Sequence, residues 1–231
     1  MAYTKNLMIG VKKKQIHVYE LLAGLFVMTL IVSNIASTKI VAVGPLVFDA
    51  GTILFPLAYI IGDIVTEVYG FRKMRALLYV GITTLLLTML TFWVVQLLPA
   101  ASDWHNQAAY DATLGVVWRI AFASMVAIFV GELINAYILA SMKIHTKGAK
   151  LWQRLIGSSA VGCLIDTAVF SILAFAGTMS NDAMIHLIAT VFAIKVATEV
   201  IISPVTAKLI ERIKRHERID TYEKPAAYLV D

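Results

Sequence analysis

The chain has 231 residues, of which 59% are hydrophobic and 15% charged, with a formal net charge of +5. Soluble domains usually carry about 45–50% apolar and about 25% charged residues. The apolar excess falls in six stretches, each close to or above the roughly 20 residues that a helix needs to cross a bilayer. In chain order they are Val18–Thr38, Ala50–Tyr69, Leu77–Leu98, Gly115–Met142, Leu155–Ala176 and Ala183–Ile210. This pattern excludes a soluble enzyme, a nucleic-acid-binding domain and a secreted disulfide scaffold.

The sequence therefore predicts an all-α membrane protein with six transmembrane helices. We divide it into an N-terminal segment (1–17), a single transport domain (18–210) and a C-terminal tail (211–231) that extends the last helix and frays into solvent. The first 20 residues contain no apolar core, so we expect a retained first span and no cleavable signal peptide. The single cysteine, Cys163, lies inside a span and can form no internal disulfide.

Basic residues indicate the orientation of the spans. Lysine and arginine gather in the N-terminal segment, in the connections after the second and fourth stretches, and in the tail. The alternate connections contain Lys39 alone. The positive-inside rule therefore places both termini and the two basic connections in the cytoplasm.

Several ionisable and amide side chains lie within the apolar stretches, where a charge costs about 2.5–3.5 kcal/mol on insertion scales. A helical rise of about 1.5 Å per residue places a charge in each of four spans within about 6 Å of the mid-plane. The candidates for a site are Asn34 in the first span, Asp63 and Glu67 in the second, Glu132 and Asn135 in the fourth, Asp166 in the fifth, and Lys195 and Glu199 in the sixth. Arg119, near the outer start of the fourth span, is expected to anchor at the interface instead.

Helical spacing indicates that these side chains converge. Tyr59, Asp63 and Glu67 recur every four residues and share one helix face, and the pairs in the fourth and sixth spans are three and four residues apart. Five carboxylates face one lysine, so they cannot all be ionised and dry: some must be protonated, hydrated or bound to a ligand that donates hydrogens. The alternatives are a purely structural ion pair between Asp166 and Lys195, which equal depth on neighbouring spans predicts, and an interhelical hydrogen bond from Asn34.

Helix-breaking residues accompany the carboxylates. Pro56 and Gly62 lie in the second span and Pro204 in the sixth. Interrupted helices beside intramembrane carboxylates are typical of transport sites. A simple kink without function is the alternative for Pro204.

Four strings carry a family resemblance: SNIASTK (Ser33–Lys39), FPLAYIIGDIVTEVYG (Phe55–Gly70), GELINAYILASMK (Gly131–Lys143) and RLIGSSAVGCLIDTAVF (Arg154–Phe170). They resemble the queuosine precursor transporter family, within the wider vitamin uptake transporter group. The likeness extends from about Val18 to Arg212 and includes the helix with Lys195, Glu199 and Pro204. It implies six transmembrane helices and import of 7-cyano-7-deazaguanine and 7-aminomethyl-7-deazaguanine across the bacterial inner membrane, for queuosine salvage in tRNA.

The residue chemistry fits such a substrate. One carboxylate can accept both the N1–H and the exocyclic amine of a guanine-like base, Asn135, Lys195 or Asn34 can donate to its O6, and Tyr59 can pack on its ring. We expect no cofactor, no metal and no nucleic-acid partner; the chain meets a small 7-deazapurine and the lipid bilayer. The expected substrate-binding residues are Asn34, Tyr59, Asp63, Glu67, Glu132, Asn135, Asp166, Lys195 and Glu199.

Two alternative functions predict sequence patterns that differ from those in this chain. A vitamin-binding subunit that needs a separate ATPase module would resemble its class in an Ala-x-x-x-Ala pattern on the first helix, and Val18–Thr38 has none. An intramembrane aspartyl protease using Asp63 and Asp166 would need a Gly-x-Gly-Asp string, and Ile60–Asp63 reads Ile-Ile-Gly-Asp. Two energy sources remain open, proton coupling through the acidic cluster and facilitated diffusion with metabolic trapping, and exposed apolar spans are compatible with a homodimer.

Overall fold

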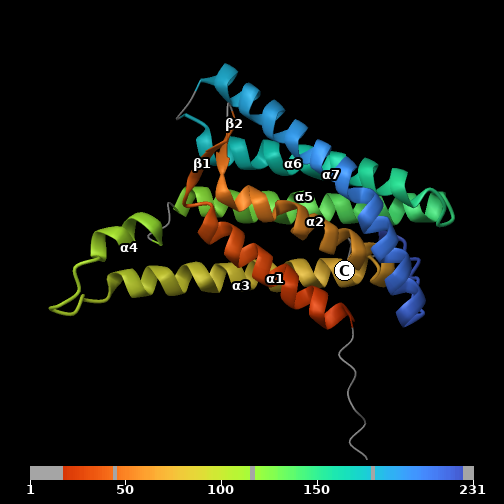
Figure 1. Cartoon of the computed structure of the whole chain (residues 1–231), viewed down its shortest axis with the longest axis horizontal. Coiled ribbons are helices and arrows are strands. Elements are labelled where there is room, and N and C mark those ends of the chain that lie inside the picture. Colours follow the sequence, from red (N-terminus) through yellow and green to blue (C-terminus); the bar gives the residue numbers. More distant parts are fainter. Residues whose placement is uncertain (1–17, 44–45, 115–117, 178–179, 226–231) are drawn as a thin grey trace, which may run out of the picture.

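The structure is a computed structural model and describes residues 18–43, 46–114, 118–177 and 180–225; the N-terminal segment 1–17 lies outside them. Six segments of the described chain are long and apolar enough to cross a membrane, which confirms the predicted number. They are α1 (Val18–Ala36), a composite second segment (Ala50–Tyr69), α3 (Phe71–Leu97), α5 (Trp118–His145), α6 (Leu151–Phe175) and α7 (Asn181–Glu217). Figure 1 shows them as one elongated bundle.

A β-hairpin and a short helix lie in the connections between the spans. Strands β1 (Ile40–Val43) and β2 (Leu46–Asp49) form an antiparallel pair in which Val41 lies opposite Phe48. Their β-branched and aromatic residues favour extended backbone. Helix α4 (Gln107–Thr113) lies between α3 and α5. The all-α prediction therefore holds for the bundle, to which the structure adds this hairpin.

The second segment is interrupted. A 3₁₀ helix η1 (Ala50–Leu54) leads into α2 (Phe55–Ile64), and the π-helical turn η2 (Val65–Tyr69) follows. Pro56 lies in the first turn of α2, where its missing N–H removes no helical hydrogen bond. Gly70 ends the segment with φ +94°, a conformation that a residue with a Cβ rarely adopts.

Helices α5 and α6 pack closely because two glycines face each other's helix. A Cβ on Gly131 would lie 2.6 Å from the Cβ of Asp166, and a Cβ on Gly162 would lie 2.8 Å from the Cβ of Asn135. Small residues at such contacts let helix backbones approach in a membrane protein. The approach brings the polar residues of the two helices together.

Helix α7 continues through Pro204 and changes direction along its length (Figure 1). Proline cannot donate to the carbonyl four residues earlier. That carbonyl, on Val200, accepts a hydrogen bond from the Ser203 hydroxyl at 3.2 Å instead. The local serine thus compensates for the missing backbone bond.

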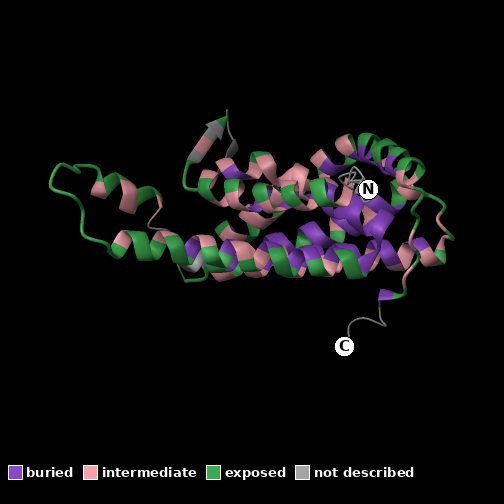
Figure 2. Cartoon of the chain, turned by 90° about the horizontal axis from the view of Figure 1, so that it is seen from below, coloured by how far each residue is buried: buried purple, intermediate pink, exposed green. Residues whose placement is uncertain are grey.

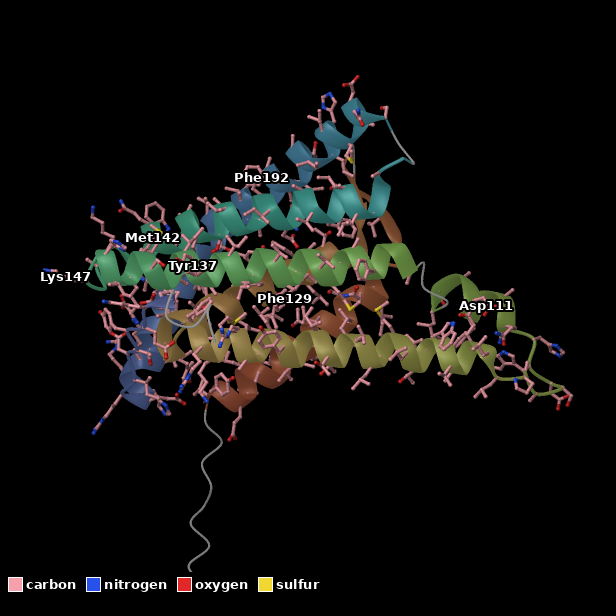
Figure 3. All side chains as sticks on the ribbon, turned by 180° about the vertical axis from the view of Figure 1, so that it is seen from behind. Asp111, Phe129, Tyr137, Met142, Lys147 and Phe192 are labelled. Atoms are coloured by element: carbon pink, nitrogen blue, oxygen red, sulfur yellow. The ribbon has the colours of Figure 1, made fainter. Side chains whose placement is uncertain are left out.

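One end of the bundle collects the basic connections and the outermost turns of α1 and α7. The Val18 amide donates to Glu217 Oε1 at 2.7 Å, so α1 begins where α7 ends. Lys147 lies at this end, which we call the basic end, and Asp111 of α4 lies at the opposite one (Figure 3). Burial is concentrated toward the basic end, and the α4 end is mostly exposed (Figure 2).

Candidate functional site

Helices α2, α5 and α7 bring together Asp63, Glu132 and Glu199 in the interior of the bundle. Their exposed fractions are 0%, 2% and 6%. Asn135, at 0%, and Tyr59, at 3%, are buried with them. We call these five residues the central cluster. The sequence predicted this convergence from helical spacing and span depth.

Asp63 is the carboxylate of the central cluster with identified donors. Asn135 Nδ2 donates to its Oδ1 at 3.0 Å, and Ser159 Oγ of α6 donates to its Oδ2 at 3.4 Å. Two hydrogen bonds to a carboxylate favour its ionised form. Ser159 was not among the predicted site residues, although it lies in a string that carried the family resemblance.

Glu132 lies against the backbone of α2. A Cβ on Gly62 would be 2.7 Å from Glu132 Oε2, so the glycine makes room for this carboxylate. Neither oxygen of Glu132 has a hydrogen-bond partner among the described residues. Gly62, expected only to interrupt a helix, therefore seats a carboxylate with two vacant acceptors.

The remaining vacant polar atoms lie on the second segment, α5, α6 and α7. They are the Tyr59 hydroxyl, Thr66 Oγ1, Asn135 Oδ1, Thr167 Oγ1 and Glu199 Oε1, all buried without a hydrogen-bond partner in the described chain. Buried polar groups are normally satisfied, so a concentration of unsatisfied ones indicates a ligand-binding region. Both hydrogen donors and acceptors are present among them.

Asp166 and Lys195 form the ion pair that equal depth predicted, and it joins α6 to α7. Lys195 Nζ also lies 3.9 Å from the centroid of the Phe55 ring. Phe55 in turn packs on Tyr59, with ring centroids 4.3 Å apart. The pair and the Phe55 ring therefore border the central cluster, and Phe55 lies four residues before Tyr59, at the same spacing that relates Tyr59 to Asp63.

No cation among the described residues pairs with Asp63, Glu132 or Glu199. Three unpaired carboxylates in one dry interior cannot all be ionised. No group of three His, Cys, Asp or Glu side chains in the described ranges is arranged to hold a metal ion. The chemistry that fits this arrangement is hydrogen bonding to donors, carried by a ligand or by protons on the carboxylates themselves.

Glu67 has a different environment. Arg154 donates to both of its oxygens, from Nη1 at 2.5 Å and from Nη2 at 3.1 Å. Lys214 Nζ lies 2.7 Å and Lys143 Nζ 3.5 Å from Oε1. With Asp220, bound by both lysines, these residues form what we call the Glu67 network. Glu67 thus offers no vacant acceptor.

Asn34 lies on α1, where its Nδ2 donates to the Leu30 carbonyl at 2.9 Å. This bond stays within one helix, so it is not the interhelical bond that was considered from the sequence.

The C-terminal tail does not fray as expected. Helix α7 extends to Glu217, and the chain then turns back along the basic end. The Thr221 amide donates to the Val68 carbonyl at 3.2 Å, Lys143 Nζ donates to the Thr221 carbonyl at 2.8 Å, and the Arg72 amide donates to Glu223 Oε2 at 3.0 Å. The predicted helical extension is confirmed, but the expected fraying is wrong for the described part of the tail, because Lys214, Glu217, Asp220 and Glu223 find partners there.

Asp220 holds this tail in place through ion pairs with Lys143 and Lys214. Partial burial alone would raise the pKa of Asp220, but hydrogen bonds from Lys143 and Lys214 outweigh burial and lower the pKa below its ordinary value. A lowered pKa means that the contribution to stability is present at neutral pH and is lost as the pH falls through the acidic range. The tail contact is therefore intact at physiological pH.

Comparisons with known proteins also indicate a transport function. A family model described as "Putative vitamin uptake transporter" matches residues 49–209. The chain is 29% identical over 200 residues to a protein of Bacillus subtilis (strain 168) named "Probable queuosine precursor transporter". The aligned region covers 84% of this chain and 87% of that protein. No solved structure matches the chain.

Proposed function

Because the chain belongs to the putative vitamin uptake transporter family, we propose that it imports queuosine precursors through the bacterial inner membrane. Family membership makes it a transporter rather than an enzyme, and its six candidate spans make it a membrane protein. The likeness to the Bacillus subtilis protein supports the substrate class. We propose 7-cyano-7-deazaguanine and 7-aminomethyl-7-deazaguanine as substrates, and residues 18–210 as one transport domain.

The observation that carries this proposal is the pair of vacant oxygens on Glu132. A guanine-like base presents N1–H and an exocyclic amine side by side, and one carboxylate accepts both in a bidentate arrangement. The Tyr59 hydroxyl, buried without a partner, can donate to O6. The Phe55–Tyr59 pair offers a flat aromatic surface for the ring.

The proposed substrate-binding residues divide by their contacts. Glu132 and Tyr59 present vacant groups, and Asp63 and Asn135 support them through their shared hydrogen bond. The Asp166–Lys195 pair borders the site, whereas the Glu67 network lies toward the basic end. We therefore assign recognition to four residues, Glu132, Tyr59, Asp63 and Asn135, and a structural role to Glu67.

Transport requires the bundle to open, because Glu132 and Asp63 are 2% and 0% exposed. The interrupted second segment and α7 with Pro204 are the elements whose helical bonding is already broken. Broken helices beside a mid-membrane site are typical of alternating access. We propose that these two elements move to admit the base from one side and release it on the other.

Uptake of labelled 7-deazaguanine bases tests the function. Cells that cannot make these bases should accumulate label only when they express this chain. The purified chain in proteoliposomes should exchange external labelled base for internal unlabelled base without any other protein. Uptake that requires an added ATPase module would contradict autonomous transport and support a binding subunit.

Replacing Glu132 with glutamine tests recognition. The amide keeps the shape of the side chain but places a donor against a donor of the base. An unsatisfied buried donor costs about 1–3 kcal/mol, so we expect base affinity to fall by about 5- to 100-fold. The measurement is exchange in proteoliposomes, with the exposed Glu20→Gln as the matched control.

Competition sharpens this test. Guanine-like 7-deazapurines should compete with the labelled base, and an adenine-like 7-deazapurine, whose edge reverses the donor pattern, should not. Equal competition by both, or unchanged affinity in Glu132→Gln, would show that Glu132 does not read this edge.

Cysteine labelling tests the orientation. We propose that both termini and the basic end face the cytoplasm, because lysine and arginine gather there. In a Cys163→Ala background, a cysteine at Ser102 should react with an impermeant maleimide in intact cells, and one at Lys147 should not. Cys163 is 1% exposed, so its removal should not disturb the surface. The reverse labelling pattern would refute this orientation.

A further inference from the structure

Asp63 and Glu199 are two buried carboxylates with unequal surroundings. They lie on α2 and α7, which pack against each other, and they are close enough to interact electrostatically. Asp63 accepts hydrogen bonds from Asn135 and Ser159. Glu199 Oε1 is buried and has no partner in the described chain.

The groups around Glu199 give its charge no compensation. Every cation near it is already bound: Lys195, one turn earlier on α7, pairs with Asp166, and the cations of the Glu67 network bind Glu67. On the elements packed against α7, the titratable and charged groups are Tyr59 and Asp63 (α2), Glu67 and Tyr69 (η2), and Arg154, Cys163 and Asp166 (α6); Glu132 lies on α5 and Lys195 one turn before Glu199 on α7. The two cations in this set, Arg154 and Lys195, are bound by Glu67 and Asp166.

Asp63, Glu132 and Glu199 have no cation, so in a dry interior they hold at least one proton among them. Asp63 has two donors and the oxygens of Glu132 are assigned to the base, which leaves Glu199 as the carboxylate for the proton. Independent of the carboxylates, the Tyr59 hydroxyl and Thr66 Oγ1 are buried without partners on the same second segment. These two hydroxyls can each donate and accept a hydrogen bond, so the region can bind and relay a proton.

We propose that Glu199 carries one proton inward with each imported base, so that the proton gradient drives uptake. This inference rests on the proposed function and adds its energy source. When the outer side is open, water delivers a proton and an O–H bond forms on Glu199. When the inner side opens, that bond breaks and the proton passes to cytoplasmic water, which restores the carboxylate for the next cycle.

The position of Glu199 in α7 suits this role. Pro204 lies five residues further along, and the Val200 carbonyl beside Glu199 is held by the Ser203 hydroxyl instead of a backbone amide. A helix whose bonding is interrupted at this point can bend there. Bending of α7 would move Glu199 relative to Asp63 and change which side supplies water.

Proteoliposomes that contain the purified chain separate transport from coupling. With the membrane potential clamped at zero and a lumen one pH unit more alkaline than the medium, one proton per base supports accumulation of up to about tenfold. We expect the wild type to approach this ratio with labelled 7-aminomethyl- or 7-cyano-7-deazaguanine. A protonophore should reduce the ratio to unity without stopping exchange of external label for internal unlabelled base.

The variant Glu199→Gln, which mimics a permanently protonated acid, should keep base exchange and lose accumulation. Its accumulation ratio should fall from about tenfold to near unity. The matched control on the same helix is the exposed Glu211→Gln, which should accumulate base as the wild type does. Full accumulation by Glu199→Gln, or loss of exchange together with accumulation in folded protein, would overturn the assignment to Glu199.

The wild-type measurements stand even where the variant does not fold. Exchange without accumulation in a pH gradient would overturn proton coupling and leave the proposed function intact. Absence of exchange at equal pH would instead overturn the proposed function. A pH-sensitive dye in the lumen should report acidification on addition of base, and no acidification would also reject coupling.

Discussion

Neutralising either member of the Asp166–Lys195 pair should sharply reduce the amount of folded protein, and exchanging the two residues should restore part of it. The pair joins α6 to α7, and its side chains are 7% and 11% exposed. Removing one partner of a buried pair typically costs about 3–5 kcal/mol, because the other charge stays buried and unpaired. That cost is comparable to much of the total stability of an ordinary domain, about 5–15 kcal/mol.

Exchanging Asp166 and Lys195 should restore only part of the folded protein, because Lys195 has a second contact. Its ammonium lies 3.9 Å from the centre of the Phe55 ring. A lysine at position 166 would extend from α6, so it would not reproduce this contact. Thermal unfolding and yield in detergent should rank wild type above the exchange, and the exchange above Asp166→Asn and Lys195→Met. Lys208→Met, at an exposed position of α7, is the control. An exchange no better than either single change would show that this contact is not the source of the stability.

The spans and the Asp166–Lys195 pair were predictable because the bilayer fixes lengths and depths. A helix must be about 20 residues long to cross, and equal counts from a short connection place two side chains at equal depth. Asp166 lies 11 residues before Gly177 and Lys195 lies 13 residues after Asp182, at the two ends of a short connection. The structure confirms the pair. The hairpin of β1 and β2 lies outside the spans, where no such rule applies.

The environment of Glu67 could not be predicted by the same reasoning. The sequence assigned Lys143 and Arg154 to the basic connections that set orientation, yet their side chains are 2% and 1% exposed. Long basic side chains can extend along a helix by a full turn or more. Position in the chain therefore locates the backbone of such a residue but not its charge.

The sequence also could not predict which carboxylate would keep vacant acceptor oxygens. Spacing indicated that Asp63 and Glu132 would converge, but the same spacing allows either of them to take the amide of Asn135. The structure gives that amide to Asp63 and leaves Glu132 free beside Gly62. This distinction depends on side-chain geometry, and it is what separates the supporting carboxylate from the proposed reader of the base.

Replacing Glu67 with glutamine should destabilise the protein more than the loss of any one of its cations. The Glu67 network contains three cations and two carboxylates, and Asp220 is 44% exposed while Glu67 is fully buried. Without the Glu67 charge, three cations would share one half-exposed carboxylate. We expect a loss of about 3–5 kcal/mol, as for other buried charges left without a partner. Lys214→Met leaves Glu67 with Lys143 and Arg154, so its effect should be smaller.

A second change separates this structural role from the substrate-binding role that spacing suggested for Glu67. Adding Arg154→Met to Glu67→Gln removes a buried cation that the first change leaves without its carboxylate, and an uncompensated buried charge is what makes a broken pair costly. The double variant should therefore unfold at a higher temperature than Glu67→Gln alone. Uptake per folded molecule should stay near the wild-type value in Lys214→Met and in whatever fraction of Glu67→Gln folds. If Glu67→Gln is instead as stable as the wild type but fails to transport, Glu67 binds the substrate and the assignment of recognition to Glu132, Tyr59, Asp63 and Asn135 is incomplete.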